Sequence, residues 1–233
     1  MKRHSWYSRP PGFNYFHIGP ITESASHHND IMVEVRNRIQ QAWGCFWSLR
    51  QWLLNRRIPI RQRLDLWRLA IDSTLLWGSA SWTVNDSVKR IIVAMEHAMH
   101  RKILMMPRSP VETCWQYRGR CARIYASWLR ERKAFTIYQK CLNKIWTWAG
   151  HVARLPDTRI VKCCLEHKCV QWQYVARLVG GQGHRRGGAF KRWENKLEQW
   201  CMRQWNQPWM TVHATHSKET WNNLASDFAR ATG

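Results

Sequence analysis

Apolar side chains recur every three to four positions along most of the chain, which is the spacing of one face of an α-helix. The first such run begins at Asp30, whose carboxylate suits a helix N-terminus, and it ends at residues 55–59. Pro59 then opens a second helix, because its fixed φ angle suits a first turn. The segments predicted to be helical are 30–53, 59–75, 86–106, 120–149, 158–178, 190–205 and 217–229, with 111–119 as a turn or short helix. The chain is therefore predicted to be mainly α.

Breaks in this pattern divide the chain into five parts. Residues 1–28 are rich in Pro, Ser and His and are predicted to be irregular, with one candidate strand over 13–21. The other parts are a helical bundle over 29–110, a basic helical linker region over 111–179, a glycine-rich basic loop over 180–189 and C-terminal helices over 190–233. No fixed-period repeat is seen in the sequence.

The excess of positive charge indicates which kind of partner the protein binds. The chain has 37 Lys and Arg against 15 Asp and Glu, a net charge of +22. A polyanion is the favoured partner, because each neutralised phosphate releases a condensed counterion, although a merely soluble basic surface is the alternative. An apolar content of 45% excludes a wholly disordered basic tail. Most of the 17 Trp are predicted to pack in the core, and a few are candidates for stacking on bases.

The candidate chemistry is sparse. A polymerase holds two metal ions between paired carboxylates, but no two acidic residues are adjacent in this sequence, so no catalytic residue is predicted. The one metal-like group is Cys163, Cys164, His167 and Cys169, on which a metal-dependent nuclease would depend. On a helix Cys169 would point away from the others, so ordinary core cysteines are favoured and no cofactor is predicted. The eight Cys show no disulfide framework and no apolar signal core follows Met1, which predicts an intracellular protein without a membrane span.

The glycine-rich segment has two interpretations. It holds five Gly within residues 180–188, follows no predicted strand and is not closed by Gly-Lys-Ser/Thr, so it is neither a P-loop nor a dinucleotide fingerprint. Its backbone N–H groups with Arg185 and Arg186 would suit a backbone phosphate. A plain linker between two helical parts explains the same residues equally well.

Several segments carry a familiar pattern in a fixed order. Residues 13–57 contain F-H-I-G-P-I followed by D-I-M-V-E-V-R-N-R-I-Q-Q-A, residues 75–83 read L-L-W-G-S-A-S-W-T, residues 146–154 read W-T-W-A-G-H-V-A-R, and residues 185–194 read R-R-G-G-A-F-K-R-W-E. These segments, with residues 213–228, resemble the thumb and following linker region of non-LTR (LINE-type) retrotransposon reverse transcriptases. The sequence departs from the family pattern at Gly188-Ala189, where Gly-Arg-Pro is usual, and at Thr215-His216.

The resemblance implies a function without catalysis. Family thumbs are helical and hold the template–primer duplex by its backbone, so the implied partners are RNA, DNA or an RNA–DNA hybrid, together with a reverse transcriptase polypeptide that carries the palm. The fingers, the palm and the Ala-Asp-Asp turn are not in this sequence. Trp146 and Trp148 are expected to pack. The expected nucleic-acid contacts are Arg56, Arg57, Arg61 and Arg63 at a helix junction, His151, Arg154, Arg185, Arg186, Lys191 and Arg192. The alternative is a retroelement remnant that folds poorly without its palm domain.

Overall fold

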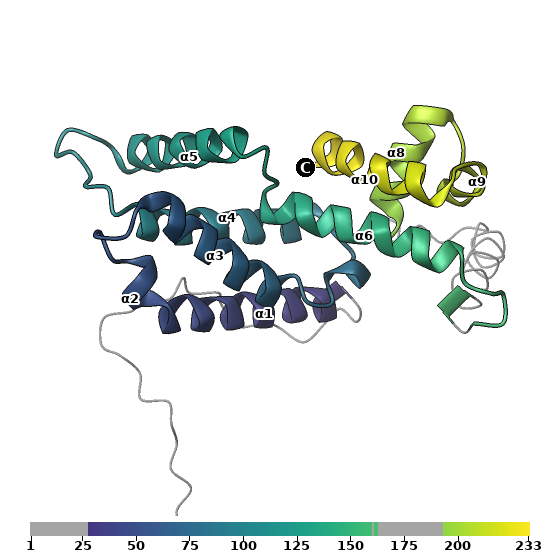
Figure 1. The fold of residues 1–233 in the computed structure, drawn as a ribbon, viewed down its shortest axis with the longest axis horizontal. Helices are drawn as coiled ribbons and strands as arrows, with labels where there is room; N and C mark the ends of the chain where they lie inside the picture. Colours follow the sequence, from purple (N-terminus) through teal and green to yellow (C-terminus); the bar gives the residue numbers. More distant parts are fainter. Residues whose placement is uncertain (1–27, 160, 163–192) are drawn as a thin grey trace, which may run out of the picture.

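The computed structural model is an assembly of helices, and it describes residues 28–159, 161–162 and 193–233 (Figure 1). The elements are α1 (His28–Ser48), α2 (Arg50–Leu53), α3 (Ile60–Leu75), the short 3-10 helix η1 (Ser79–Ser81), α4 (Asp86–Leu104), α5 (Cys114–Glu131), α6 (Ile137–Ala153), α8 (Asn195–Trp205), α9 (Trp209–Thr215) and α10 (Lys218–Thr232). The prediction of a mainly α chain is confirmed, and the described residues contain no strand. The candidate strand, the cysteine cluster and the glycine-rich loop lie outside these residues.

Three helices form the first part of the core. Helix α1 packs along α3, and α4 contacts both. Their apolar stripes meet at side chains that are fully buried, among them Phe46 of α1, Trp67 of α3 and Ile92 of α4. The indole of Trp67 donates to the sulfur of Met99 at 3.3 Å, which satisfies its one polar atom inside the core.

The ends of these helices follow the chemistry of their sequence. Pro59 stands before the first residue of α3, with a φ of −54° that suits this position. Helix α4 begins at Asp86 as predicted, and the side chain of Asn85 accepts a hydrogen bond from the backbone N–H of Val88 at 2.8 Å. Helix α4 ends at Leu104, and Met105 adopts a left-handed φ of 50°.

The predicted single helix over 120–149 is wrong. The structure divides this segment into α5 and α6, and α5 begins earlier than expected, at Cys114. Each helix starts with a capping box, in which a threonine and a glutamine three residues later exchange hydrogen bonds with each other's backbone N–H. The two pairs are Thr113 with Gln116 and Thr136 with Gln139. This exchange satisfies free N–H groups at both starts and fixes the boundary between the helices.

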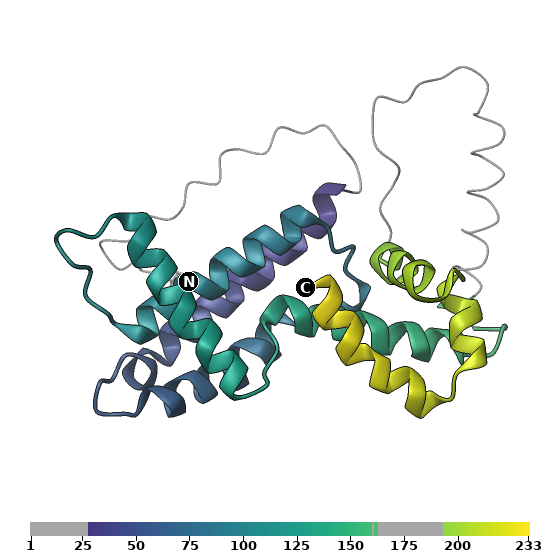
Figure 2. The same cartoon turned by 90° about the horizontal axis from the view of Figure 1, so that it is seen from above.

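Helix α6 joins the two halves of the molecule. It contacts α4 and η1 of the first half, and α10 lies along it in the second half (Figure 2). The indole rings of Trp146 and Trp221 stack with centroids 4.1 Å apart. Each indole N–H donates to the other residue's backbone carbonyl, at 2.6 Å and 3.2 Å. Gly150 lies against the same indole of Trp221, where a Cβ atom would come within 2.4 Å of the ring nitrogen. The packing therefore unites α6, which belongs to the expected linker region, with the C-terminal helices.

The C-terminal helices complete this second half. Helix α8 ends at Trp205 as predicted, but it begins at Asn195, after a turn at residues 193–194. Helix α9 was not predicted; it follows Pro208, and the carboxylate of Glu198 accepts from the backbone N–H of Trp209 at 2.9 Å. Helix α10 begins after Ser217, whose side chain caps it, which confirms the predicted start near this residue. None of the described helices is long and apolar enough to cross a membrane.

A buried carboxyl group ties three helices together. Glu96 of α4 is 1% exposed and accepts hydrogen bonds from the hydroxyl of Tyr125 in α5 at 2.6 Å and from the backbone N–H of Ile137 in α6 at 3.1 Å. Burial raises the pKa of Glu96 from 4.5 to about 7, although both hydrogen bonds act in the opposite direction. Glu96 is therefore a structural junction whose charge costs stability when it ionises.

We expect Glu96→Gln to change the pH dependence of stability. Between pH 4.5 and about pH 7 the folded chain keeps a proton on Glu96 that the unfolded chain has lost, so this group destabilises the fold progressively as pH rises. Glutamine keeps the oxygen acceptor and cannot ionise. The free energy of unfolding of the variant should equal that of the wild type near pH 4 and exceed it by about 3 kcal/mol at pH 8. Urea unfolding across this range measures the difference.

Subtracting the two curves removes other titrating groups, in particular His100, whose pKa is lowered by burial and which acts in the opposite sense. Glu131→Gln, at an exposed carboxylate, is the control for losing one negative charge. A constant difference between Glu96→Gln and wild type at all pH values would contradict the prediction.

Candidate nucleic-acid interface

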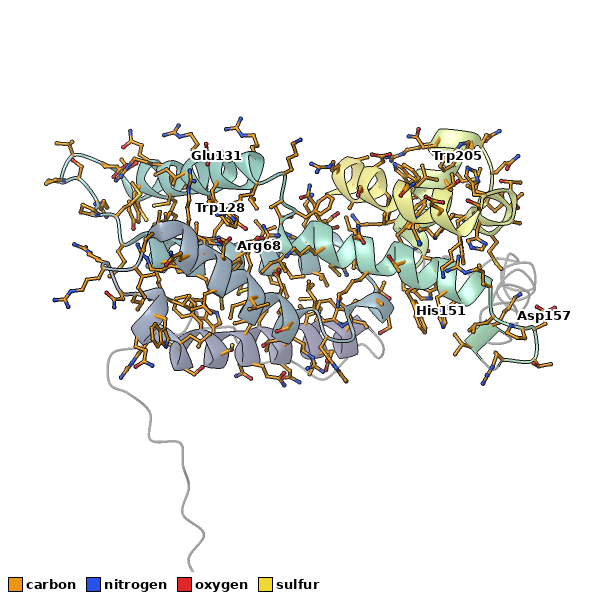
Figure 3. The ribbon with its side chains drawn as sticks, in the orientation of Figure 1. Arg68, Trp128, Glu131, His151, Asp157 and Trp205 are labelled. Atoms are coloured by element: carbon orange, nitrogen blue, oxygen red, sulfur yellow. The ribbon has the colours of Figure 1, made fainter. Side chains whose placement is uncertain are left out.

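The residues expected to contact nucleic acid divide into separate places. Arg56 and Arg57 are exposed in the turn between α2 and α3, and Arg61 is exposed in the first turn of α3. His151 and Arg154 lie at the C-terminal end of α6, at the opposite end of the molecule from α2 (Figure 3). The remaining expected contacts lie outside the described residues, and they are Arg185, Arg186, Lys191 and Arg192. The structure therefore does not gather the described residues into one site.

Arg63 has a different place from the one expected. It is 7% exposed and donates to three backbone carbonyls, those of Leu53 at 3.3 Å, Ile58 at 3.0 Å and Ile103 at 2.6 Å. Burial, with a smaller effect of Arg56, lowers its pKa. We therefore assign Arg63 to the interior, where it ties α2, the turn before α3 and the end of α4 together, and we remove it from the contact candidates.

The chain that leaves α4 is surrounded by donors. The carbonyl of Met105 accepts from Arg56 at 3.4 Å, that of Met106 accepts from the hydroxyl of Tyr117 at 3.2 Å, and that of Pro107 accepts from Arg120 at 3.0 Å. Positive charge at this position also complements the partial negative charge of a helix C-terminus. These bonds hold the chain between α4 and α5 in place and bring the α2–α3 turn close to it.

An open cleft lies between this segment and the first half of α5. Its volume is about 1090 Å³, and residues 107–112 and the outer side of α5 line it. Trp115 is 83% exposed and Val111 is 91% exposed. The one carboxylate in the lining, Glu112, accepts two hydrogen bonds from Arg120, at 2.9 Å and 2.7 Å, and this pairing lowers its pKa. The cleft thus offers an aromatic face beside a carboxylate that is already neutralised.

Three arginines give the cleft and the adjoining surface of α5 their charge. Arg108 and Arg123 line it, and Arg118 follows Trp115 by one helical turn on the exposed surface of α5. Among the described residues Arg118 and Arg123 form no ion pair; Arg108 donates to the backbone carbonyl of Glu112 at 3.0 Å, and its charge makes a small contribution to the lowered pKa of that carboxyl. A guanidinium group in this state can bind phosphate in a bidentate manner, and an exposed indole can stack on a base.

Sequence reasoning missed this cleft. It described residues 111–119 as a turn or short helix, so the phase of α5 was not followed back to Trp115. The buried positions of α5 are Cys121, Tyr125, Trp128 and Leu129, and Trp115 does not lie on their side of the helix. A tryptophan on the polar side of an amphipathic helix, next to arginines, is the signal that could have identified the site.

The residues at the far end of α6 have structural partners. The guanidinium of Arg154 lies 3.0 Å from Nε2 of His213, which must accept because arginine can only donate. Burial and Arg154 lower the pKa of His213, which keeps its ring neutral for this bond. His151 is exposed and packs against Trp148, with ring centroids 5.3 Å apart. Trp146 is fully buried, as expected for a packing residue.

Within the described residues no three His, Cys, Asp or Glu side chains come together as metal ligands, and the cluster from Cys163 to Cys169 lies outside them. Comparison of the chain with protein-family models, with curated proteins and with solved structures finds no match.

Proposed function

We propose that this chain is the thumb and linker part of a LINE-type reverse transcriptase and that it binds nucleic acid strands by their phosphate backbone. By itself this part has no polymerase activity. The observation that carries the proposal is the cleft on α5, which is lined by Arg108, Arg123 and the exposed Trp115, with Arg118 exposed on the adjoining surface of the helix. Among the described residues Arg118 and Arg123 form no ion pair. Arginines without partners beside an aromatic face suit a ligand that is both anionic and flat.

The surrounding charge supports the same ligand. A net charge of +22 attracts any polyanion from solution. The cleft is the place on the described surface where such a polyanion would bind. Arg56, Arg57 and Arg61 extend the basic surface on the neighbouring α2–α3 turn and the start of α3. Phosphate contacts of this kind position a strand without reading its bases, so the expected binding has little sequence preference.

The alternative is a retroelement remnant that folds poorly without a palm domain. The described helices share a core with fully buried Trp67, Trp146 and Trp221, and this packing favours a chain that folds on its own. A remnant would instead aggregate and melt without a cooperative transition. Size-exclusion chromatography and thermal unfolding separate the two hypotheses before any ligand is added.

The binding test is a salt titration. Fluorescence anisotropy with labelled single-stranded RNA, single-stranded DNA and an RNA–DNA duplex should show tight binding at about 50 mM salt. The affinity should fall by at least about 100-fold by about 200 mM salt, as expected for five or so phosphate contacts. The proposed function would be contradicted if the monomeric protein bound with an affinity that does not depend on salt, or if it did not bind at low salt.

A further inference from the structure

Trp115 differs from the other tryptophans of the described residues in how freely its ring is exposed. At 83% it is the most exposed of them, and within the described part of the chain no aromatic ring or cation lies over its indole. Trp77, the next most exposed at 66%, has the guanidinium of Arg38 over its ring at 4.3 Å. Keeping so large an apolar surface in water costs free energy. Trp115 therefore presents a free aromatic face to a ligand.

A bare stretch of helix lies next to Trp115 on the same side of α5. Trp115, Gly119 and Arg123 follow one another at intervals of four residues, and all three line the cleft. A Cβ atom added at Gly119 would meet nothing within 4 Å, so this part of the cleft floor is open. At the helical rise, Trp115 and Arg123 stand about 12 Å apart along the axis. A few nucleotides of a strand cover that length, with a base at the indole and a phosphate at the guanidinium.

The segment before α5 adds apolar surface and charge to the same cleft. Pro107, Pro110 and Val111 line it, together with Arg108. The volume of about 1090 Å³ is at the upper end of the range for ligand sites. Figure 1 shows α5 and this segment at an outer edge of the molecule, so a strand can reach the cleft without displacing a helix. The lining thus combines apolar surface for the face of a ring with cations for phosphates.

A nucleobase fits this combination only when it is unpaired. Within a duplex the neighbouring base pairs cover both faces of a base, and a protein reaches only the backbone and the edges in the grooves. An unpaired base can turn its face to an aromatic side chain, and every base has such a face. The arginines alone would hold either form, because both carry phosphates. Trp115 is therefore the residue that distinguishes a single strand from a duplex.

We propose that the α5 cleft selects single-stranded segments of nucleic acid, with an unpaired base stacked on Trp115 and the adjoining backbone lying over Gly119 toward Arg123. This inference rests on the proposed function and adds the class of strand to it. The selection depends on whether a base is unpaired and not on which base it is. The expected ligands are single strands, overhangs and loops, whereas a blunt duplex binds through its phosphates alone.

The test compares three labelled probes by fluorescence anisotropy at one salt concentration. They are a DNA single strand, an abasic DNA strand of the same length, and the blunt duplex of the first strand. The abasic strand keeps the phosphates and lacks the bases, so its difference from the first strand measures what the bases contribute. The wild type should bind the single strand about tenfold more tightly than either other probe, as expected for one stacked base.

Substitutions separate stacking from simple apolar contact. Trp115→Phe keeps an aromatic face and should retain most of the preference, whereas Trp115→Leu keeps only apolar surface and should abolish it. Gly119→Leu fits the helix and places a bulky side chain on the open part of the floor, so it should weaken single-strand binding by about tenfold as well. Trp77→Ala is the control at an exposed tryptophan that does not line the cleft, and it should bind as the wild type does.

The outcomes distinguish this inference from the function on which it rests. Equal affinities of the wild type and Trp115→Leu for the single strand would overturn the inference and leave the proposed function intact. The same conclusion would follow if the wild type bound the abasic strand or the duplex as tightly as the single strand. No binding of the wild type to any of the three probes at low salt would instead contradict the proposed function itself.

Discussion

Replacing Gly150 by alanine is expected to lower the free energy of unfolding by about 3 kcal/mol, the upper end of the usual cost of forcing an extra carbon atom into a packed core. The new Cβ atom would lie 2.4 Å from Nε1 and 2.6 Å from Cδ1 of Trp221. That indole cannot move aside easily, because it is fully buried, stacks on Trp146 and donates its N–H to the backbone carbonyl of Trp146. Since whole domains are stable by only about 5–15 kcal/mol, α8 to α10 should loosen from α6.

Gly44→Ala is the matched control for this substitution. Gly44 also lies within a helix, but a Cβ atom added there meets nothing within 4 Å. The free energy of unfolding of this variant should be higher than that of the wild type by about 0.5–1 kcal/mol, because alanine has a higher helix propensity than glycine. Urea unfolding monitored by tryptophan fluorescence measures both variants. Equal effects at Gly150 and Gly44 would show that the approach of α6 to Trp221 is not as close as described.

Replacing Arg108, Arg118 and Arg123 together by glutamine should weaken nucleic-acid binding by roughly 100-fold at about 0.1 M salt. For single strands each phosphate contact contributes about 0.7 to the slope of log K against log salt, so the loss of three contacts lowers that slope by about 2. Arg118 and Arg123 form no ion pair among the described residues, and the one hydrogen bond of Arg108 lies within the exposed segment between α4 and α5, so the replacement should leave the helices unchanged. Anisotropy titrations at several salt concentrations measure both the affinity and the slope.

A control with equal loss of charge separates the cleft from the general field of the protein. Arg90, Arg203 and Lys218 are exposed residues of α4, α8 and α10 that do not line the cleft. Their replacement by glutamine also removes three positive charges. It should weaken nucleic-acid binding by no more than about threefold, because salt screens the attraction between the strand and distant charges. An equal loss in both triple variants would mean that the strand is held by net charge alone.

The sequence predicted the helices correctly where Pro or Ser marks their start, and it missed a boundary where the apolar spacing runs on without a break. Pro59 and Ser217 mark the starts of α3 and α10 in ways that hold in any context. The break between α5 and α6 was missed because apolar spacing continues through Phe135 and Ile137. No glycine marks this turn either, since Lys133 itself adopts the left-handed φ of 49° there.

The candidate site was less predictable than the fold. The four arginines of this junction are equivalent by sequence, but their places differ. Arg63 is buried and donates to the carbonyl of Ile103 in α4, whereas Arg56 reaches the carbonyl of Met105 from an exposed position. The contact of Arg63 joins residues 40 positions apart, which no local pattern encodes. The α5 cleft was accessible in principle through the position of Trp115.

The pair of indoles between α6 and α10 also sets an order of events during synthesis. Trp146 and Trp221 are separated by 75 residues in the chain. At the roughly 5–20 residues per second of translation, the apolar face of α6 waits about 4–15 s for its partner to emerge. During that interval the first three-helix core can already form from local contacts, while the Trp146 face stays open to chaperones or to other copies of the chain. Helix α10 thus closes a surface that the nascent chain exposes while the 75 residues between the two tryptophans are added.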